Sequence, residues 1–218
     1  MSRWWWPRPQ HDEHRWVVLD VESSGLDARR DRLLAVAAIA LHSDGDRPPR
    51  IVLSDSFELV LQQHAPVHDK ANILLHGIGV GAQRQGRPAA EGLAELQAWV
   101  GRSPLIAFHA AFDRTLLDRA MHQALGRRLV GPWLDLEDVA AVLRPDLPAR
   151  SLDEWMAALG VHCLQRHQAA ADTLATAELL LKLWPAVQRA GGRPGFAGLQ
   201  QLARQRRWLP RATAAAGM

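Results

Sequence analysis

The sequence predicts a mixed α/β domain in which three strands come first and helices then alternate with short strands. The first observation behind this prediction is a set of three apolar, β-rich runs near the start of the chain, separated by polar turns. The second is a change to helical periodicity in the later part, interrupted twice by short apolar runs. The third is size, because 218 residues with a hydrophobic share of 48% suffice for one buried core.

The three early strands are expected to form an antiparallel meander. Residues 16–21 (WVVLDV) make a short β-rich run that ends in a polar turn around Gly25. Residues 32–42 form a nearly continuous apolar strand, and residues 50–61 form a third strand with partial alternation. An Asp-Gly-Asp turn at 44–46 joins the last two strands. Because short turns connect consecutive strands, neighbouring strands should run in opposite directions.

The later part of the chain has the pattern of helices separated by two short strands. Apolar residues of 89–100 recur at helical spacing, and Pro104 then introduces a short strand of sequence LIAF. Residues 169–189 make one long amphipathic helix with a continuous apolar side. The other expected segments, in chain order, are a helix at 111–125 ended by Gly126, a strand at 132–136, and helices at 137–143 and 151–159.

Both ends of the chain differ in composition from the predicted domain at 16–190. Residues 1–15 form an arm rich in Trp and Arg that lacks the pattern of a secretory signal. We expect this arm to be poorly ordered or to dock its tryptophans locally, the alternative being a surface arm that touches nucleic acid or a membrane. A GGRPG segment at 191–195 breaks the chain, so residues 191–218 should form a basic C-terminal helix or tail.

Overall charge says little about function by itself. The chain has 26 Lys+Arg and 23 Asp+Glu, which gives a formal net charge of only +3. Lys70 and Lys182 are the only lysines, so nearly all positive charge is on arginine, which suits bidentate phosphate contacts. A compositional bias toward arginine and alanine is an equally simple explanation.

Cysteine usage and apolar runs restrict the cellular context. Cys163 is the single cysteine, so no disulfide can form within the chain, which favours a reducing compartment and a cytoplasmic location. The longest apolar run, at 33–41, is far shorter than the roughly 20 residues of a membrane-spanning helix. The sequence therefore predicts no membrane span.

Asp20 and Glu22 are the first residues with a chemical pattern. They are two apart on a predicted strand, so both carboxylates should leave the same face of the sheet. Two buried carboxylates side by side are costly unless a cation neutralises them. Oxygen ligands favour Mg²⁺ or Mn²⁺. The plain alternative is a strand end where two acids face solvent.

Two further acids lie near the starts of predicted helices. Asp113 follows the short strand at 105–108, at a place where strand ends and helix starts gather on one edge of a sheet. Asp172 lies in an otherwise apolar helix, where an unpaired acid is costly. On one regular helix His167 and Asp172 would be about 140° apart, so they converge only if His167 lies in the preceding loop. The alternatives are an acid stabilised by the helix dipole and an ordinary surface histidine.

The order and spacing of these segments resemble the three motifs of the DEDDh family of 3′–5′ exonucleases, in particular the DNA polymerase III epsilon-subunit branch. The motifs are D-V-E-S-S-G-L at 20–26, H-A-A-F-D at 109–113 and H-x4-D at 167–172, and the resemblance extends from Trp16 to Trp184. It implies a ribonuclease H-like fold: a mixed five-stranded sheet, an antiparallel meander plus parallel strands, flanked by helices. Subsidiary similarities are an H-G-I at His76–Ile78, the W-L-D-L around Asp135 and the segment from Ser151 to Val161.

The chain departs from the usual family pattern at three positions. Ser23 and Ser24 stand where two threonines are usual, and Ala110 stands where asparagine is common. The loss of that amide weakens a structural or substrate hydrogen bond. The five catalytic-type positions are unchanged.

The resemblance implies a two-metal mechanism with two divalent cations, Mg²⁺ or Mn²⁺. Asp20, Glu22 and Asp172 would hold one metal, and Asp20 would bridge to a second with help from Asp113 directly or through water. His167 would take a proton from the nucleophilic water, since a histidine ordinarily titrates near pH 6.5. The exonuclease domain would then be residues 16–190.

The resemblance also implies a pocket for the terminal nucleotide of a single-stranded or frayed 3′ end. Ser24, Gly25 and Leu26 would pack against the last base and sugar, although Gly25 also fits a plain turn. His109 and Phe112 either line the cleft or belong to the core. His76 is expected to be structural.

The motifs leave several alternatives open. They do not separate DNA from RNA, so an RNA-trimming exoribonuclease of the same family is the second hypothesis. A non-catalytic nucleic-acid-binding or assembly subunit is the third, although the complete set of acids argues against it. A polymerase or other protein partner is possible, and the oligomeric state is undetermined. The C-terminal residues Arg204, Arg206, Arg207 and Arg211 are expected to be a solvated helix end; the alternative is contact with phosphates or a partner.

Overall fold

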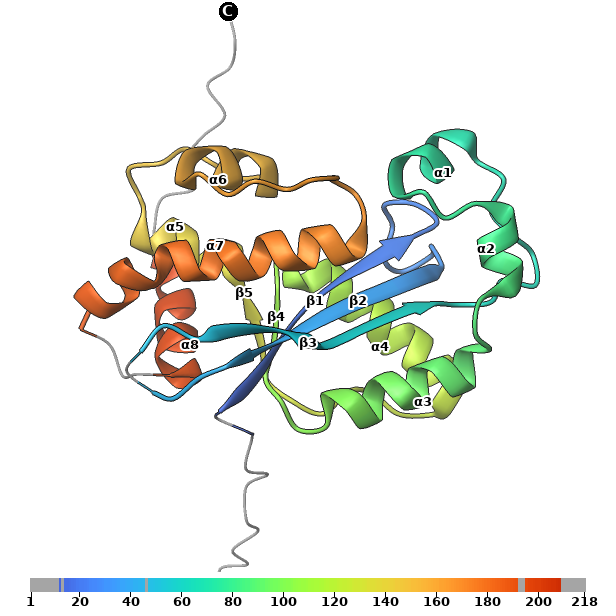
Figure 1. Ribbon diagram of the computed structural model, residues 1–218, viewed down its shortest axis with the longest axis horizontal. Helices are drawn as coiled ribbons and strands as arrows, with labels where there is room; N and C mark the ends of the chain where they lie inside the picture. Colours follow the sequence, from blue (N-terminus) through green and yellow to red (C-terminus); the bar gives the residue numbers. More distant parts are fainter. Residues whose placement is uncertain (1–11, 13, 46, 192–194, 209–218) are drawn as a thin grey trace, which may run out of the picture.

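Five strands form one mixed sheet in the order β3-β2-β1-β4-β5 (Figure 1). The computed structural model describes residues 12, 14–45, 47–191 and 195–208. The three early strands pair antiparallel, whereas β1 pairs with β4 and β4 with β5 in parallel. The predicted meander and the mixed five-stranded sheet are therefore confirmed. The strands are β1 (Arg15–Ser23), β2 (Leu33–His42), β3 (Arg50–Val60), β4 (Leu105–Ala107) and β5 (Trp133–Asp135).

Most helices lie where their periodicity predicts them, but two short helices between β3 and α3 were not predicted. These two, α1 and α2, have six or seven residues each, which is too short for a helical period to be recognised. Within the described ranges, no helix has the length and apolar character needed to cross a membrane. The helices are α1 (Lys70–His76), α2 (Val80–Gln85), α3 (Ala89–Val100), α4 (Ala110–Leu125), α5 (Leu136–Leu143), α6 (Leu152–Leu159), α7 (Ala169–Arg189), α8 (Phe196–Gln205) and the 3₁₀ turn η1 (Arg206–Trp208).

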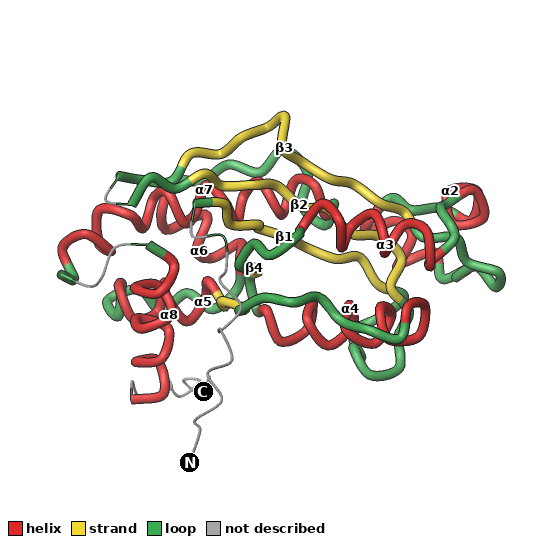
Figure 2. Tube along the Cα trace, turned by 90° about the horizontal axis from the view of Figure 1, so that it is seen from below, coloured by secondary structure: helices red, strands yellow, loops and turns green. Residues whose placement is uncertain are grey.

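Helices cover both faces of the sheet. Successive side chains of β1 point alternately to these two faces. In Figure 1 the strands run between α7 above and α3 with α4 below, and Figure 2, seen from below, shows α3 in front of the strands. Trp16 and Val18 belong to the core on the α7 side, whereas Val17 and Leu19 pack on the side of α3 and α4. Because the strand has a period of two, the even-numbered acids that follow continue the α7 side.

The segment expected to form a basic C-terminal helix or tail contributes to the core. Phe196 and Leu199 of α8 are buried in the same cluster as Trp16 and α7. The ring of Trp16 lies 5.8 Å from that of Phe196 and 6.1 Å from that of Trp184, centroid to centroid. The first residues of the Trp-rich arm, and Arg211, lie outside the described residues.

Candidate active site

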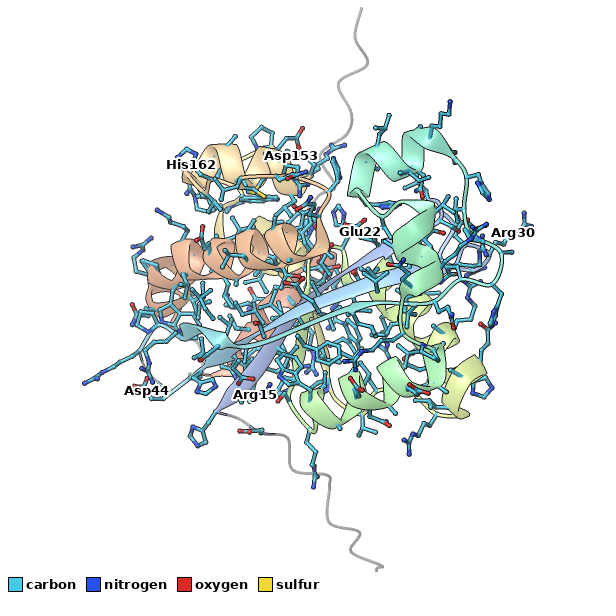
Figure 3. All side chains as sticks on the ribbon, turned by 45° about the vertical axis from the view of Figure 1, so that its right-hand side comes forward. Arg15, Glu22, Arg30, Asp44, Asp153 and His162 are labelled. Carbon is cyan, nitrogen blue, oxygen red and sulfur yellow. The ribbon has the colours of Figure 1, made fainter. Side chains whose placement is uncertain are left out.

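Four carboxylates from three separate segments lie at one end of the sheet. Asp20 and Glu22 are on the last part of β1, Asp113 is in the first turn of α4, and Asp172 is in the first turn of α7. Asp113 and Asp172 are only 4% and 6% exposed, so neither is an ordinary surface acid. In Figure 3, Glu22 lies near the end of β1, between α6 and α7 on one side and α1 and α2 on the other.

The electrostatics show that these carboxylates act on one another. Burial, and then the charges of the other three acids, hold the pKa of Asp20 well above its usual range. Burial and the nearby charge of Asp172 raise the pKa of Glu22 to about 8. Burial raises the pKa of Asp113 to about 7. The folded protein thus resists ionising Asp20, Glu22 and Asp113 together unless positive charge is supplied.

The donor set fits a hard divalent cation. All four side chains offer oxygen, which Mg²⁺ and Mn²⁺ prefer. Glu22 Oε1 is buried and has no hydrogen-bond partner within the described part of the chain, so it is free to accept a ligand bond. An unpaired buried oxygen is costly, and a bound cation would remove that cost.

Arg166 supplies positive charge to the cluster in this structure. Its guanidinium forms ion pairs with Asp172 and with Asp153 of α6. Burial tends to lower the pKa of Arg166, but hydrogen bonds to the two aspartates outweigh it and raise the pKa. Cys163 Sγ also contacts Asp172, 3.7 Å from Oδ1. Sequence reasoning missed Arg166, although it directly precedes His167 in the third motif.

The pairing of Asp172 with Arg166 bears on metal binding. Among the described residues, no three His, Cys, Asp or Glu side chains are grouped closely enough to hold a metal ion as they stand. The Asp172 carboxylate is directed toward Arg166 and Cys163. In this conformation it is therefore not placed to act as a metal ligand together with the other acids. Coordination by Asp172 therefore requires its carboxylate to exchange the guanidinium for the metal.

His167 satisfies the condition set by its spacing from Asp172. It lies in the loop before α7, with a left-handed backbone (φ 61°), and its side chain is exposed. Its backbone N–H donates to Asp172 Oδ2 at 3.1 Å. The prediction that His167 precedes the helix while Asp172 lies in its first turns is confirmed. This hydrogen bond ties the loop that carries His167 to the first turn of α7.

The second motif forms the start of α4. His109 is the N-cap residue, with a left-handed backbone (φ 58°), and its N–H donates to Asp135 Oδ1 at 3.0 Å. The side chain of His109 is exposed, and its ring packs in a tilted arrangement against Phe108, with 4.6 Å between ring centroids. Phe112 is partly buried against the core on the α4 side. Ala110 is buried, and its methyl side chain, unlike an asparagine amide, needs no hydrogen-bond partner there.

The turn after β1 explains why Gly25 is required. A Cβ at Gly25 would lie 2.6 Å from Asp31 Oδ2, so a larger residue would displace that carboxylate. Asp31 organises the turn, because it accepts from Ser24 Oγ at 3.0 Å and from the Asp27 N–H at 2.8 Å. Leu26 is 93% exposed, which leaves its apolar side chain available for a ligand.

His76 has the structural role predicted for it. Its Nδ1 accepts from the Ile78 N–H at 3.0 Å, and its Nε2 lies 2.8 Å from Asn72 Oδ1. Burial lowers the pKa of His76, in agreement with a neutral ring that accepts at one nitrogen and donates at the other. Asn72 in turn donates to the Ser23 carbonyl at 3.1 Å, which fastens α1 to the end of β1.

The mixed five-stranded sheet thus carries a group of carboxylates at the end of its central strand β1. Residues 17–180 match the family model RNase_T, described as exonuclease, and the chain belongs to this exonuclease family. The resemblance found in the three motifs is thereby confirmed at the level of the family.

Two curated relatives connect the chain with replication proteins. It is 29% identical over 174 residues to the DNA polymerase III PolC-type of Bacillus subtilis, covering 79% of this chain and 12% of that protein. It is 28% identical over 183 residues to a DNA polymerase III subunit epsilon-like protein of Rhodobacter capsulatus, covering 83% and 25%. The chain therefore spans a quarter or less of the length of these relatives.

Solved structures with a similar fold are those of E. coli exonuclease I. A complex of that enzyme with a dT13 oligonucleotide has a TM-score of 0.69 at 19% identity and covers 82% of this chain and 42% of the other. A zinc-ion-bound form of its complex with single-stranded DNA has a TM-score of 0.64 at 19% identity, covering 78% and 40%. At this identity the similarity establishes the fold.

Proposed function

We propose that the protein is a metal-dependent 3′–5′ exonuclease that releases nucleoside monophosphates from the 3′ ends of DNA. The observation that carries this proposal is the group of four acids Asp20, Glu22, Asp113 and Asp172, two of them buried (Asp113 and Asp172), in a chain of the exonuclease family. Such a cluster is costly to keep without positive charge, and divalent cations are the partners its oxygen ligands favour.

Asp20, Glu22 and Asp172 would hold one divalent cation, and Asp20 would bridge to a second with help from Asp113, directly or through water. Two such cations stabilise the attacking and leaving oxygens of an in-line phosphodiester displacement. Mg²⁺ or Mn²⁺ fits the oxygen donors, and a zinc-bound form is known for an exonuclease I of the same fold. To bind this cation, Asp172 would release Arg166, with which it forms an ion pair in this structure.

His167 would remove the proton from the attacking water. Its exposed side chain can reach a substrate, and the hydrogen bond from its N–H to Asp172 links it to a proposed metal ligand. This hydrogen bond would hold His167 beside the carboxylate that is proposed to bind metal.

The turn after β1 would receive the terminal nucleotide. Leu26 offers an exposed apolar side chain, and the Ser24–Asp31 hydrogen bond holds the turn around Gly25 in place. His109 is exposed at the start of α4 and would line the other side of the cleft. Phe112 is partly buried in the core, so its proposed contact with substrate is limited to its exposed edge.

DNA is the substrate that the comparisons favour. Two relatives are DNA polymerase III proteins, and exonuclease I was solved with a single-stranded DNA oligonucleotide. Association with a polymerase or another protein is part of the proposal, as is a cytoplasmic location, which fits the free thiol of Cys163. RNA trimming is the alternative outcome of the test.

The proposal is tested by incubating the purified protein with 5′-labelled single-stranded DNA and, separately, RNA, with Mg²⁺ or EDTA. We expect a ladder that shortens from the 3′ end of DNA, requires Mg²⁺ and is absent with Asp20→Asn. Glu91→Gln, which changes an exposed acid of α3, is the matched control and should retain activity. If only RNA is shortened, the substrate is RNA and not DNA. If neither nucleic acid is shortened in the presence of Mg²⁺, the proposed exonuclease activity is refuted.

A further inference from the structure

A second cavity, of about 380 Å³, is lined in part by the 24–32 turn that follows β1. Its other walls are the start of β2, residues 61–63 directly after β3, and residues of α3 and α4. Among the described residues that line it, none is acidic. Its polar lining consists of Arg30, Arg32, Arg119, Gln62, Gln63 and Gln123.

The arginines of this cavity retain unused donor capacity. The side chain of Arg32 donates to the Ala65 carbonyl and that of Arg119 to the Arg29 carbonyl, so the backbone holds both guanidinium groups. Arg119 Nε is nevertheless buried without a hydrogen-bond partner in the described part of the chain. A buried donor without a partner is costly, and an anion oxygen would satisfy it.

Neighbouring acids neutralise this positive charge only in part. Arg30 is exposed and lies 3.7 Å from Asp27, a weak pair in solvent. Asp31 is engaged by Ser24 Oγ and by a backbone N–H of its own turn. The cavity beside the start of α4, of about 390 Å³, differs because Asp135 and Asp138 line it together with Arg114 and Arg204. The cavity lined by Arg30, Arg32 and Arg119 is thus the better anion site.

We propose that this cavity binds a backbone phosphate of the nucleic acid whose 3′ end occupies the carboxylate site. The inference rests on the proposed function, which places a polyanion at the neighbouring cleft. Planar guanidinium groups match phosphate oxygens in geometry as well as in charge. The arginines of the lining therefore suit a phosphate ester of the bound strand.

The position of the cavity fits an internal nucleotide. Arg119 follows Asp113 by six residues on α4, which is about 9 Å along the helix axis. This offset exceeds the roughly 3.4 Å that one nucleotide spans along a strand, so a phosphate bound here would belong to a nucleotide before the 3′-terminal one. Arg30 and Arg32 belong to the same turn as Leu26, so a phosphate bound here would also stabilise the turn that receives the terminal nucleotide.

The test compares the double variant Arg30→Gln/Arg119→Gln with a double control, Arg127→Gln/Arg189→Gln. The control removes the same charge from exposed arginines outside the cavity. Binding of a fluorescein-labelled 12-nucleotide single strand is followed by anisotropy in EDTA, where no hydrolysis occurs. We expect the Kd to rise about tenfold, or about 1.4 kcal/mol, in the cavity variant and less than about twofold in the control.

Two further measurements test the proposal: the salt dependence of strand binding, and the hydrolysis of a substrate that has no internal nucleotide. Loss of one phosphate contact should reduce the slope of log K against log salt by about 0.7. With Mg²⁺, Arg30→Gln alone should hydrolyse the p-nitrophenyl ester of thymidine 5′-monophosphate with an unchanged KM, because that substrate has no internal nucleotide and the exposed Arg30 side chain makes only a weak ion pair with Asp27. Equal Kd values for variant and control, or an equal rise in KM for both substrates, would overturn the proposal.

The outcome is separable from that of the proposed function. If the wild-type protein fails to hydrolyse any substrate, the exonuclease proposal fails, while the anisotropy measurement still decides whether the cavity holds phosphate. Thermal unfolding of each variant shows whether it is folded. A variant that unfolds early is replaced by Arg30→Gln alone, whose exposed side chain has little structural role.

Discussion

Glu22→Gln should stabilise the metal-free protein while it abolishes activity. The pKa of Glu22 is raised from 4.5 to about 8 by burial and by the charge of Asp172. The unfolded chain releases this proton near pH 4.5, but the folded protein retains it up to about pH 8. Folding therefore becomes less favourable as the pH rises through this window. At pH 7 the cost approaches about 3 kcal/mol, at about 1.4 kcal/mol per pH unit.

The measured gain should be smaller than this limit, about 1 to 3 kcal/mol, because the neighbouring carboxylates share protons with Glu22. For a chain of this size that corresponds to a rise in Tm of roughly 3 to 10 °C. Glutamine keeps the oxygen that accepts from the backbone at Ala169, so the substitution removes charge with little change in shape.

The assay is thermal unfolding in EDTA between pH 5 and pH 8, for the wild-type protein, Glu22→Gln and the control Glu91→Gln. The wild-type protein should lose stability across this range, whereas Glu22→Gln should lose less. Mg²⁺ should then stabilise the wild-type protein and have little effect on the variant. A wild-type stability that rises toward pH 8 in EDTA, or a variant less stable than the control at pH 7.5, would refute the electrostatic reasoning.

Three further predictions concern single residues. Arg166→Gln should tighten Mg²⁺ binding about three- to tenfold by calorimetry, because the cation no longer competes with the guanidinium for Asp172; weaker binding would contradict this. His167→Ala should lower kcat at least about 100-fold and leave metal affinity within twofold, and loss of metal binding would assign His167 another role. Gly25→Ala should destabilise the fold by about 1 to 3 kcal/mol in urea and raise KM, because its Cβ would meet the Asp31 carboxylate; an unchanged midpoint would show that the turn adapts.

The sequence predicts the elements that have a strong period or clear boundaries. The β-rich run at Arg15–Ser23, the long amphipathic helix Ala169–Arg189 and the helix stopped by Gly126 all lie where expected. These segments bury continuous apolar faces, and such faces leave a period that can be read locally. The helices Lys70–His76 and Val80–Gln85 were missed because they bury one side chain each, His76 and Gln83.

The acids of the site were predictable because an acid among apolar residues is conspicuous in the sequence. Asp20, Glu22, Asp113 and Asp172 each interrupt an apolar pattern, and their order along the chain carries the family resemblance. Their mutual electrostatic influence in the structure supports the expectation that they form one cluster.

The arginines of the molecule could not be assigned in this way. Arg166 is one of many arginines in the sequence, and only the fold brings it against Asp172 and Asp153. The cavity lined by Arg30, Arg32 and Arg119 likewise depends on the packing of a turn against a helix far along the chain. Long-range contacts of this kind leave no local pattern, because exposed and paired arginines have the same neighbours in sequence.

The most direct test of the central claim is the number of Mn²⁺ ions that the carboxylate cluster binds. Titration of the protein with Mn²⁺ at pH 7.5, in the presence of thymidine 5′-monophosphate, can be followed by electron paramagnetic resonance of the free ion. We predict saturation at two ions per chain for the wild-type protein and the loss of both saturable sites in Asp20→Asn. Absence of saturable binding, or binding that persists unchanged without the Asp20 carboxylate, would contradict the account.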